Sequence, residues 1–244
     1  MDPLTAMATP LGTIPVMSQM GRRDALVVLL TLAAGATNVL TLTALGGVPA
    51  SIMTANLVVV GLSITHHEGT LGWHAGAALA AFIVAVFLTS RLIRAWEEHS
   101  DREANPVWPR PVAVAIAAEA LPLGGLAVGW GLAGGRPAEG VQLVLCALAA
   151  FAMGVQSAAV RVLKLPGLST TFFTGLLTDT VRGFAGPGPL RWSLGATLVL
   201  ALVAGAAAEG AELSFGQLRL GPLLPLVLVC CVAALSVRGF SGEG

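Results

Sequence analysis

The sequence predicts an all-α membrane protein. Of its 244 residues, 55% are hydrophobic and only 11% are charged, with a mean hydropathy of +0.83. Soluble domains carry about 25% charged residues. Apolar stretches of about 20 residues recur along the chain, and each is long enough to cross a bilayer as a helix. The expected partner is therefore the lipid bilayer, and the zero net charge gives no argument for nucleic acid.

We expect about six transmembrane helices and two short re-entrant or broken helical segments, packed as one bundle. Residues 1–23 are polar and contain two Pro before residue 14, which predicts a mobile N-terminal tail. The first apolar run exceeds a signal-peptide core, so we expect it to be retained as a span. The spans are predicted at about 25–46, 71–94, 112–133, 140–163, 190–213 and 220–238. The short segments are predicted at about 48–65 and 167–184.

The membrane part is predicted to consist of two repeats, 24–134 and 138–240. Five residues recur at a constant offset of 119, and Gly35 and Gly154 share that offset. Individual matches are common in a chain rich in Ala, Leu and Gly, but a constant offset across three consecutive elements is not. The five matched residues are Leu71, Trp73, Gly76, Ala77 and Leu79, which recur as Leu190, Trp192, Gly195, Ala196 and Leu198.

The positions of Lys and Arg distinguish two topologies. If both short segments cross the bilayer, the basic residues divide almost evenly between its two sides. If each short segment instead leaves the membrane on the side where it entered, only Arg136 and Arg219 of the 13 basic residues lie on the side opposite the N-terminus. The second arrangement is the positive-inside pattern, so we expect both termini in the cytoplasm and an inverted repeat. The alternative is eight transmembrane spans that include both short segments, because an 18-residue helix covers about 27 Å and just reaches across the hydrocarbon core.

Polar residues at matching positions predict a binding site between the two halves. Short, interrupted apolar segments in inverted halves are typical of midplane sites in transporters. Free N–H groups at the start of a buried helix would favour an anion or a carbonyl dipole. Helix packing with interhelical hydrogen bonds explains the same residues equally well. The expected lining residues are Asn38, Thr54, Asn56, Gln156, Thr171 and Thr174.

Glu119 is the candidate proton or ion site. It lies seven residues into the third span, and a carboxylate at the bilayer centre costs on the order of 3 kcal/mol or more. It should therefore face the interior as a neutral acid or as a partner of another group, and a purely structural hydrogen bond is the alternative. Glu209 and Glu212 close the fifth span and are expected at the outer interface.

We expect no metal and no cofactor. A polar cluster on the predicted outer side could bind a metal, but its spacing matches no specific site, and a solvated loop explains it better. The three cysteines lie inside apolar stretches and form no disulfide framework. The cluster is His66, His67, Glu68 and His74, and the cysteines are Cys146, Cys230 and Cys231.

The motifs resemble those of the YoaK-like family of bacterial membrane proteins, a domain of unknown function. The resemblance covers about residues 24–238 and implies a bacterial inner-membrane location. Asn38 stands where the family motif has an acid, Ala55 where it has Gly, and Ser157 where it has Asn. The motifs are Gly35-Ala36-Thr37-Asn38-Val39, Met53-Thr54-Ala55-Asn56, Glu119-Ala120-Leu121, Gly154-Val155-Gln156-Ser157-Ala158 and Thr171-Phe172-Phe173-Thr174-Gly175.

These observations favour a small-solute or ion transporter or channel. We expect no enzymatic activity, because the chain holds neither a nucleophile elbow nor a paired-His zinc motif. A non-transporting membrane scaffold or lipid-binding subunit is the alternative. Faces of small residues allow a homo-oligomer and internal packing equally well.

Overall fold

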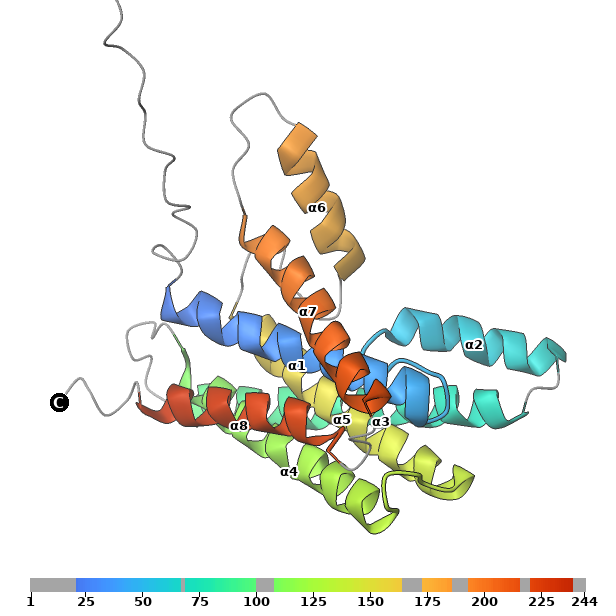
Figure 1. Ribbon diagram of the computed structural model, residues 1–244. Coiled ribbons are helices and arrows are strands. Elements are labelled where there is room, and N and C mark those ends of the chain that lie inside the picture. The colour runs from blue at the N-terminus through green and yellow to red at the C-terminus, as the bar shows by residue number, and fades with distance from the viewer. Residues whose placement is uncertain are drawn as a thin grey trace, which may run out of the picture.

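The computed structural model describes residues 21–66, 69–99, 108–163, 173–185, 193–215 and 220–238. This part of the chain is helical and contains no strand, which confirms the predicted all-α class (Figure 1). Residues 1–20 of the predicted tail and Thr171 lie outside the described residues. The helices are α1 (Arg22–Ala44), α2 (Met53–His66), α3 (Gly69–His99), α4 (Arg110–Leu132), α5 (Glu139–Val162), α6 (Phe173–Ala185), α7 (Leu194–Ser214) and α8 (Leu223–Arg238).

Helix length separates two classes of element. The helices α1, α3, α4, α5 and α7 are long and apolar enough to cross a membrane. At 1.5 Å per residue, the 14 residues of α2 and the 13 of α6 each cover about 20 Å. That is less than the roughly 30 Å of a hydrocarbon core. The 16 residues of α8 reach about 24 Å. The chain is therefore a multi-pass membrane protein with shorter helices among its spans.

Helices α1 and α5 form the centre of the bundle. In each, 67% of the most apolar stretch is buried. Helix α1 packs against α7 and α8, and α5 packs against α3 and α4. Two glycines allow close approach: a Cβ on Gly35 would lie 2.2 Å from the carbonyl oxygen of Leu202 in α7, and one on Gly154 would lie 2.7 Å from that of Phe82 in α3. Each central helix thus meets a helix from the other predicted repeat almost backbone to backbone.

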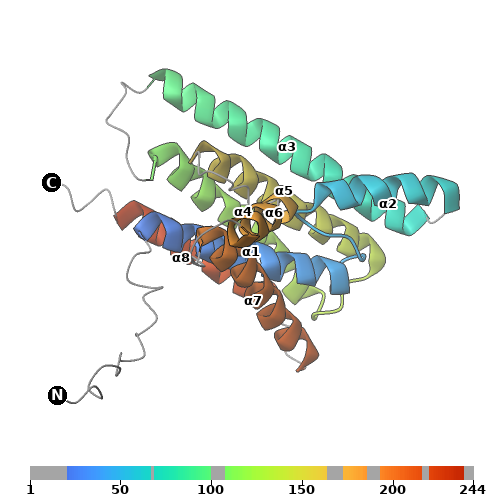
Figure 2. The ribbon, with the colours of Figure 1, turned by 90° about the horizontal axis from the view of Figure 1, so that it is seen from above.

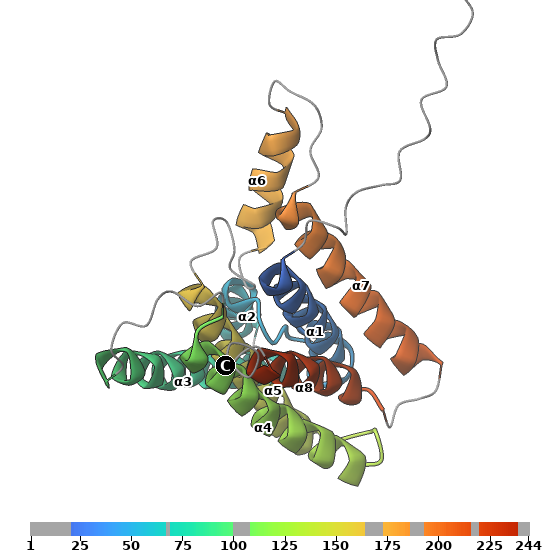
Figure 3. The same cartoon turned by 90° about the vertical axis from the view of Figure 1, so that its left-hand side faces the viewer.

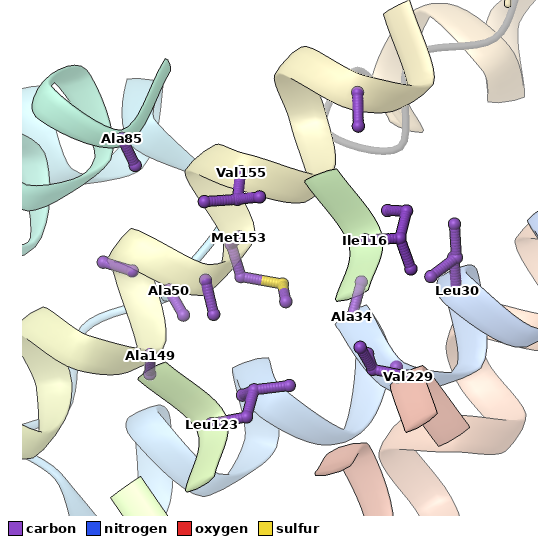
Figure 4. Packing of buried hydrophobic residues seen from close by; sticks show 14 of the residues in the cluster. Leu30, Ala34, Ala50, Ala85, Ile116, Leu123, Ala149, Met153, Val155 and Val229 are labelled. Carbon is purple, nitrogen blue, oxygen red and sulfur yellow. The ribbon is translucent and has the colours of Figure 1, made fainter. Parts of the chain in front are cut away.

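An apolar core fills the space between α1, α4, α5 and α8 (Figure 4). Side chains from all four helices converge there. Apolar surface that is removed from water stabilises a fold by about 25 cal/mol per Å². In lipid, the same contacts hold the helices together through packing. The converging residues are Leu30, Ala34, Ile116, Leu123, Met153 and Val229.

Residues 45–66 follow the course predicted for a re-entrant segment. After α1 the chain turns through Gly46 (φ 96°) and Gly47 (φ 77°), a left-handed conformation that glycine adopts without strain. It then runs back beside α1 as far as Asn38, which hydrogen-bonds Ser51. Helix α2 returns from there toward the start of α3, against which it packs. The segment therefore enters and leaves at the same end of the bundle (Figure 1).

Basic residues gather at the opposite end of the bundle. The starts of α1 and α4 and the ends of α3, α5 and α8 lie together there (Figure 2). The Arg22 guanidinium donates to the carbonyl of Leu235 in α8, and Arg23 donates to that of Leu163 after α5. Cations are favourable at helix C-termini, where carbonyl groups lack partners. Other basic residues near these helix ends are Arg91, Arg94, Arg110, Arg161 and Arg238.

Candidate polar site inside the helix bundle

Asn38 holds the extended segment before α2 against the central helix α1. Its Oδ1 accepts from the Ser51 backbone N–H at 3.0 Å, and its Nδ2 donates to Ser51 Oγ at 2.8 Å. Both residues are buried, at 7% and 2% exposure. A backbone N–H outside a helix needs such a partner at membrane depth. Asn38 therefore fixes the point at which the chain turns back toward α2.

Asn56 holds the same segment from the other side. Its Nδ2 donates to the Pro49 carbonyl at 2.8 Å, while its Oδ1 has no partner among the described residues. Asn56 is fully buried, whereas Thr54, at the second position of α2, is exposed on the surface of the single chain. Of these two predicted lining residues, one therefore faces the bundle and the other faces outward.

We expect Asn38→Leu to destabilise the protein by about 1–3 kcal/mol, because Ser51 would then keep a buried N–H without an acceptor. Asn38→Asp should cost less, since a carboxylate still accepts from the Ser51 N–H and the Ser51 hydroxyl can rotate to donate. Thermal unfolding in detergent measures both variants. Equal stability of Asn38→Leu and the parent would show that the turn does not depend on this pair.

Gln156 links the two central helices. Its Nε2 donates to the carbonyl of Leu30 in α1 at 3.1 Å, across the contact between α1 and α5. The side chain is 1% exposed, and its Oε1 has no partner among the described residues. A buried amide oxygen without a donor is unfavourable by about 1–3 kcal/mol. This atom is therefore free to accept a hydrogen bond from a bound group.

Glu119 lies on α4 within the apolar core. It is fully buried, and neither carboxyl oxygen has a partner among the described residues. Ile116 and Leu123, one helical turn to either side, point toward α1 and α8 (Figure 4). Pro122 has no N–H and interrupts the hydrogen bonding of α4 in the same turn. Such an acid must be neutral or bind a ligand, because an unpaired carboxylate is strongly disfavoured there.

The second short segment is described only from Phe173 onward. Helix α6 packs against the start of α7, where a Cβ on Gly195 would lie 2.7 Å from Thr180 Oγ1. Thr174 is exposed on α6, and Thr171 lies outside the described residues. Helix α6 projects from the rest of the bundle beside the start of α7 (Figures 1 and 3). That Thr54 and Thr174 line one site therefore stays a prediction.

His74, from the predicted outer cluster, is buried at 2% exposure. Its Nδ1 lies 2.9 Å from the Thr70 carbonyl oxygen, which can only accept, so Nδ1 carries the proton. The ring packs on Gly46, where an added Cβ would lie 2.1 Å from His74 Cδ2. His67 and Glu68 lie outside the described residues, which contain no group of three potential metal ligands.

Glu209 is more enclosed than its place in the sequence indicates. It is fully buried on α7, five residues before the helix ends. Both carboxyl oxygens lack partners among the described residues. Its position near the end of an apolar span predicts an interfacial side chain. Residues from α1 and from the turn before α8 cover it, and the sequence of α7 alone does not reveal that covering.

Comparisons with known proteins agree with the fold. Residues 26–236 match the family described as "Protein of unknown function (DUF1275)". The chain is 31% identical over 170 residues to the "UPF0700 transmembrane protein YoaK" of Bacillus subtilis (strain 168), covering 70% of this chain and 71% of that protein. No solved structure matches the chain. The protein therefore belongs to the DUF1275 family, the YoaK-like membrane proteins of unknown function.

Proposed function

We propose that this protein is a small-solute or ion transporter or channel of the bacterial inner membrane, with its polar site at the contact between the two halves. The observation that carries the proposal is a set of buried polar atoms that have no hydrogen-bond partner in the part of the chain that the structure describes. Glu119 offers a carboxyl group, and Gln156 offers an amide oxygen. Polar groups at membrane depth are expensive and mark substrate or ion pathways by default.

The two groups lie on α4 and α5, which pack together and share one apolar core. Glu119 lies between Ile116 and Leu123 on α4, and Gln156 follows Met153 by one turn on α5. Ile116, Leu123 and Met153 all contribute to the apolar core between α1, α4 and α5 (Figure 4). A carboxyl and an amide facing one apolar region can bind a small polar solute or a proton. Acid–base catalysis usually employs several positioned groups, so we propose transport rather than an enzymatic role.

An inverted repeat would give this site two opposite entrances. In support, α1 and α5 run in roughly opposite directions, as do α4 and α8 (Figures 1 and 2). The packing is reciprocal, since α1 meets α7 while α5 meets α3. Gly35 and Gly154, equivalent in the predicted repeat, both lie at these contacts. Inverted halves with a central site are the usual basis of alternating access.

The basic end of the bundle supports a cytoplasmic location for both termini. Lys and Arg accumulate in cytoplasmic segments, and Arg22 and Arg23 lie beside the C-terminal ends of α8 and α5. With this orientation, the turn after α1 and the end of α2 face the outside. Residues 45–52 then enter the bundle from the outer side.

The second candidate is a non-transporting scaffold or lipid-binding subunit. The closed pair between Asn38 and Ser51 favours it, because two of the polar groups in the first half satisfy each other. The outward-facing Thr54 and Thr174 would then contact lipid or a partner protein. The scaffold hypothesis predicts an interior sealed from water, whereas transport predicts an aqueous path to Gln156.

Thiol accessibility tests the proposal. Single Cys residues replace Gln156, Thr54 and Thr174 in turn, after removal of the three native cysteines. A membrane-impermeant thiol reagent is then added from each side of sealed vesicles. We expect Gln156→Cys to react from at least one side. Ala149→Cys, two turns earlier on α5 and also fully buried, is the matched control and should remain unreactive.

The three positions separate the two functions. Reaction at Gln156→Cys but not at Ala149→Cys supports an aqueous path to the polar site. Reaction at Thr54→Cys from outside and at Thr174→Cys from inside would add that the short segments line this path from opposite sides. If gel filtration shows that the Gln156→Cys variant is folded and its thiol is nevertheless completely protected, this result would contradict transport and favour the scaffold.

A further inference from the structure

We propose that Glu209 is a second proton-binding site, located where α7 meets the turn before α8. The evidence for proton binding is the surroundings of Glu209. Only a contribution of this proton to transport rests on the proposed function. Its side chain is fully buried, and both carboxyl oxygens lack partners among the described residues. Glu119, on α4, is used by the site described above, whereas nothing there uses Glu209.

A small apolar enclosure surrounds this carboxyl group. A Cβ added at Gly221 would lie 3.2 Å from Glu209 Oε1, 3.0 Å from Leu213 Cδ2 and 3.4 Å from Leu40 Cδ1. The absence of a side chain at Gly221 therefore leaves the room that the carboxyl oxygen occupies. Leu40 and Leu213 lie beside the same point of the turn. An ionised carboxylate in these surroundings would be shielded from water and would have no donor among the described residues, which favours the protonated acid.

The charged groups around Glu209 are few. On its own helix, Glu212 lies one turn nearer the end of α7 and is partly buried. Helix α1 contains no titratable side chain from residue 25 to residue 44. Helix α6, which packs at the far end of α7, brings Asp179 and Arg182. Cys230 and Cys231 of α8 are exposed, and Arg219, before the turn, lies outside the described residues.

The position also provides a route to water. Glu209 is five residues from the end of α7, and Gly221 belongs to the turn that leads into α8. Glu212 lies between Glu209 and the helix end, so it can pass a proton from the aqueous side. Helix α8 then runs from this turn to Val229, in the core that Ile116 and Leu123 of α4 share with it. The seven helical residues from Leu223 to Val229 cover about 10 Å, so α8 connects the surroundings of the two buried acids.

An apolar carbodiimide tests the proposal on the purified full-length chain. This reagent dissolves in the membrane and adds to protonated carboxyl groups, so peptide mass identifies each modified residue. We expect modification of Glu209, falling about tenfold per pH unit once the acid begins to ionise. A water-soluble carbodiimide should leave Glu209 unmodified, and Glu212 should show the opposite preference. Infrared spectra provide a second measurement, since Glu209→Gln should remove one carbonyl band of a protonated carboxyl group.

Arg219 provides the decisive variant. If Glu209 reacts in the parent and equally in Arg219→Gln, the acid holds a proton and the proposal is supported. If Glu209 reacts only in Arg219→Gln, it forms an ion pair in the parent and the proposal is wrong. The absence of both the modification and the infrared band in the parent would also overturn it. None of these outcomes depends on the accessibility of Gln156→Cys, so the second proton site and the transport function can fail separately.

Discussion

Gly35→Ala is expected to lower the free energy of unfolding by about 1–3 kcal/mol or more, because the new methyl group has no space. The added Cβ would lie 2.2 Å from the Leu202 carbonyl oxygen and 3.0 Å from the Ala206 backbone nitrogen. Both are main-chain atoms of α7, so no side-chain rotation can relieve the overlap. Helices α1 and α7 must move apart, and the packing along their whole contact is loosened.

The matched control is Gly76→Ala on α3. A Cβ there meets nothing within 4 Å, and Ala favours helix by about 1 kcal/mol relative to Gly. Stability can be followed with a thiol-reactive dye that reports exposure of the buried Cys146, after Cys230 and Cys231 are replaced by Ser. Gly76→Ala should unfold at or above the parent temperature and Gly35→Ala well below it. Similar unfolding temperatures for the two variants would contradict the close packing of α1 on α7.

The same reasoning applies to Gly154, the glycine at the matching position of the predicted second repeat. A Cβ on Gly154 would lie 2.7 Å from both the Phe82 carbonyl oxygen and the Ala85 methyl group. Their spacing in the sequence predicts that Gly35 and Gly154 are equivalent positions of a repeat. Their shared function in helix packing became visible only when α7 and α3 were placed against them. Sequence spacing indicates a repeat, but it does not identify the helix that each glycine faces.

Helix positions follow from the sequence because apolar length and chain breaks determine them. The predicted span 112–133 is α4, at Arg110–Leu132, and 140–163 is α5, at Glu139–Val162. The largest difference among the long helices is α3, which continues to His99 instead of ending near residue 94. Residues 95–99 include Ala, Trp and two Glu, which continue a helix beyond its apolar part. A hydropathy pattern marks the membrane boundary, and the helix need not end there.

The partners of polar groups could not be predicted in the same way. Asn38 was singled out because an amide in an apolar span needs a partner. Its actual partner, Ser51, lies in an extended segment whose path depends on the turn at Gly46 and Gly47. For Glu209, distance from the helix end predicts an interface, yet the turn at Gly221 covers it. Contacts made by turns and by distant helices leave no periodic signal along one helix.

Glu119→Leu is expected to increase the free energy of unfolding by about 1–3 kcal/mol, although it removes an ionisable group from the core. The unpartnered carboxyl is expensive to bury, and its neighbours Ile116 and Leu123 provide an apolar environment in which Leu packs well. Replacing buried polar groups with apolar ones of similar size is often neutral or stabilising. Glu119→Gln should leave stability nearly unchanged, since the amide is also unpartnered and of the same size.

This pair of variants separates a functional acid from a structural one without knowledge of the substrate. A structural Glu119 would donate to a neighbour, and Glu119→Leu would then destabilise the protein by leaving that neighbour unpaired. A functional Glu119 would lower the stability of the fold, as residues needed for function commonly do. The dye reaction of Cys146 measures both variants under the conditions used for Gly35→Ala. A gain for Glu119→Leu therefore indicates that the acid is retained for binding a proton or solute, and a loss indicates a scaffold.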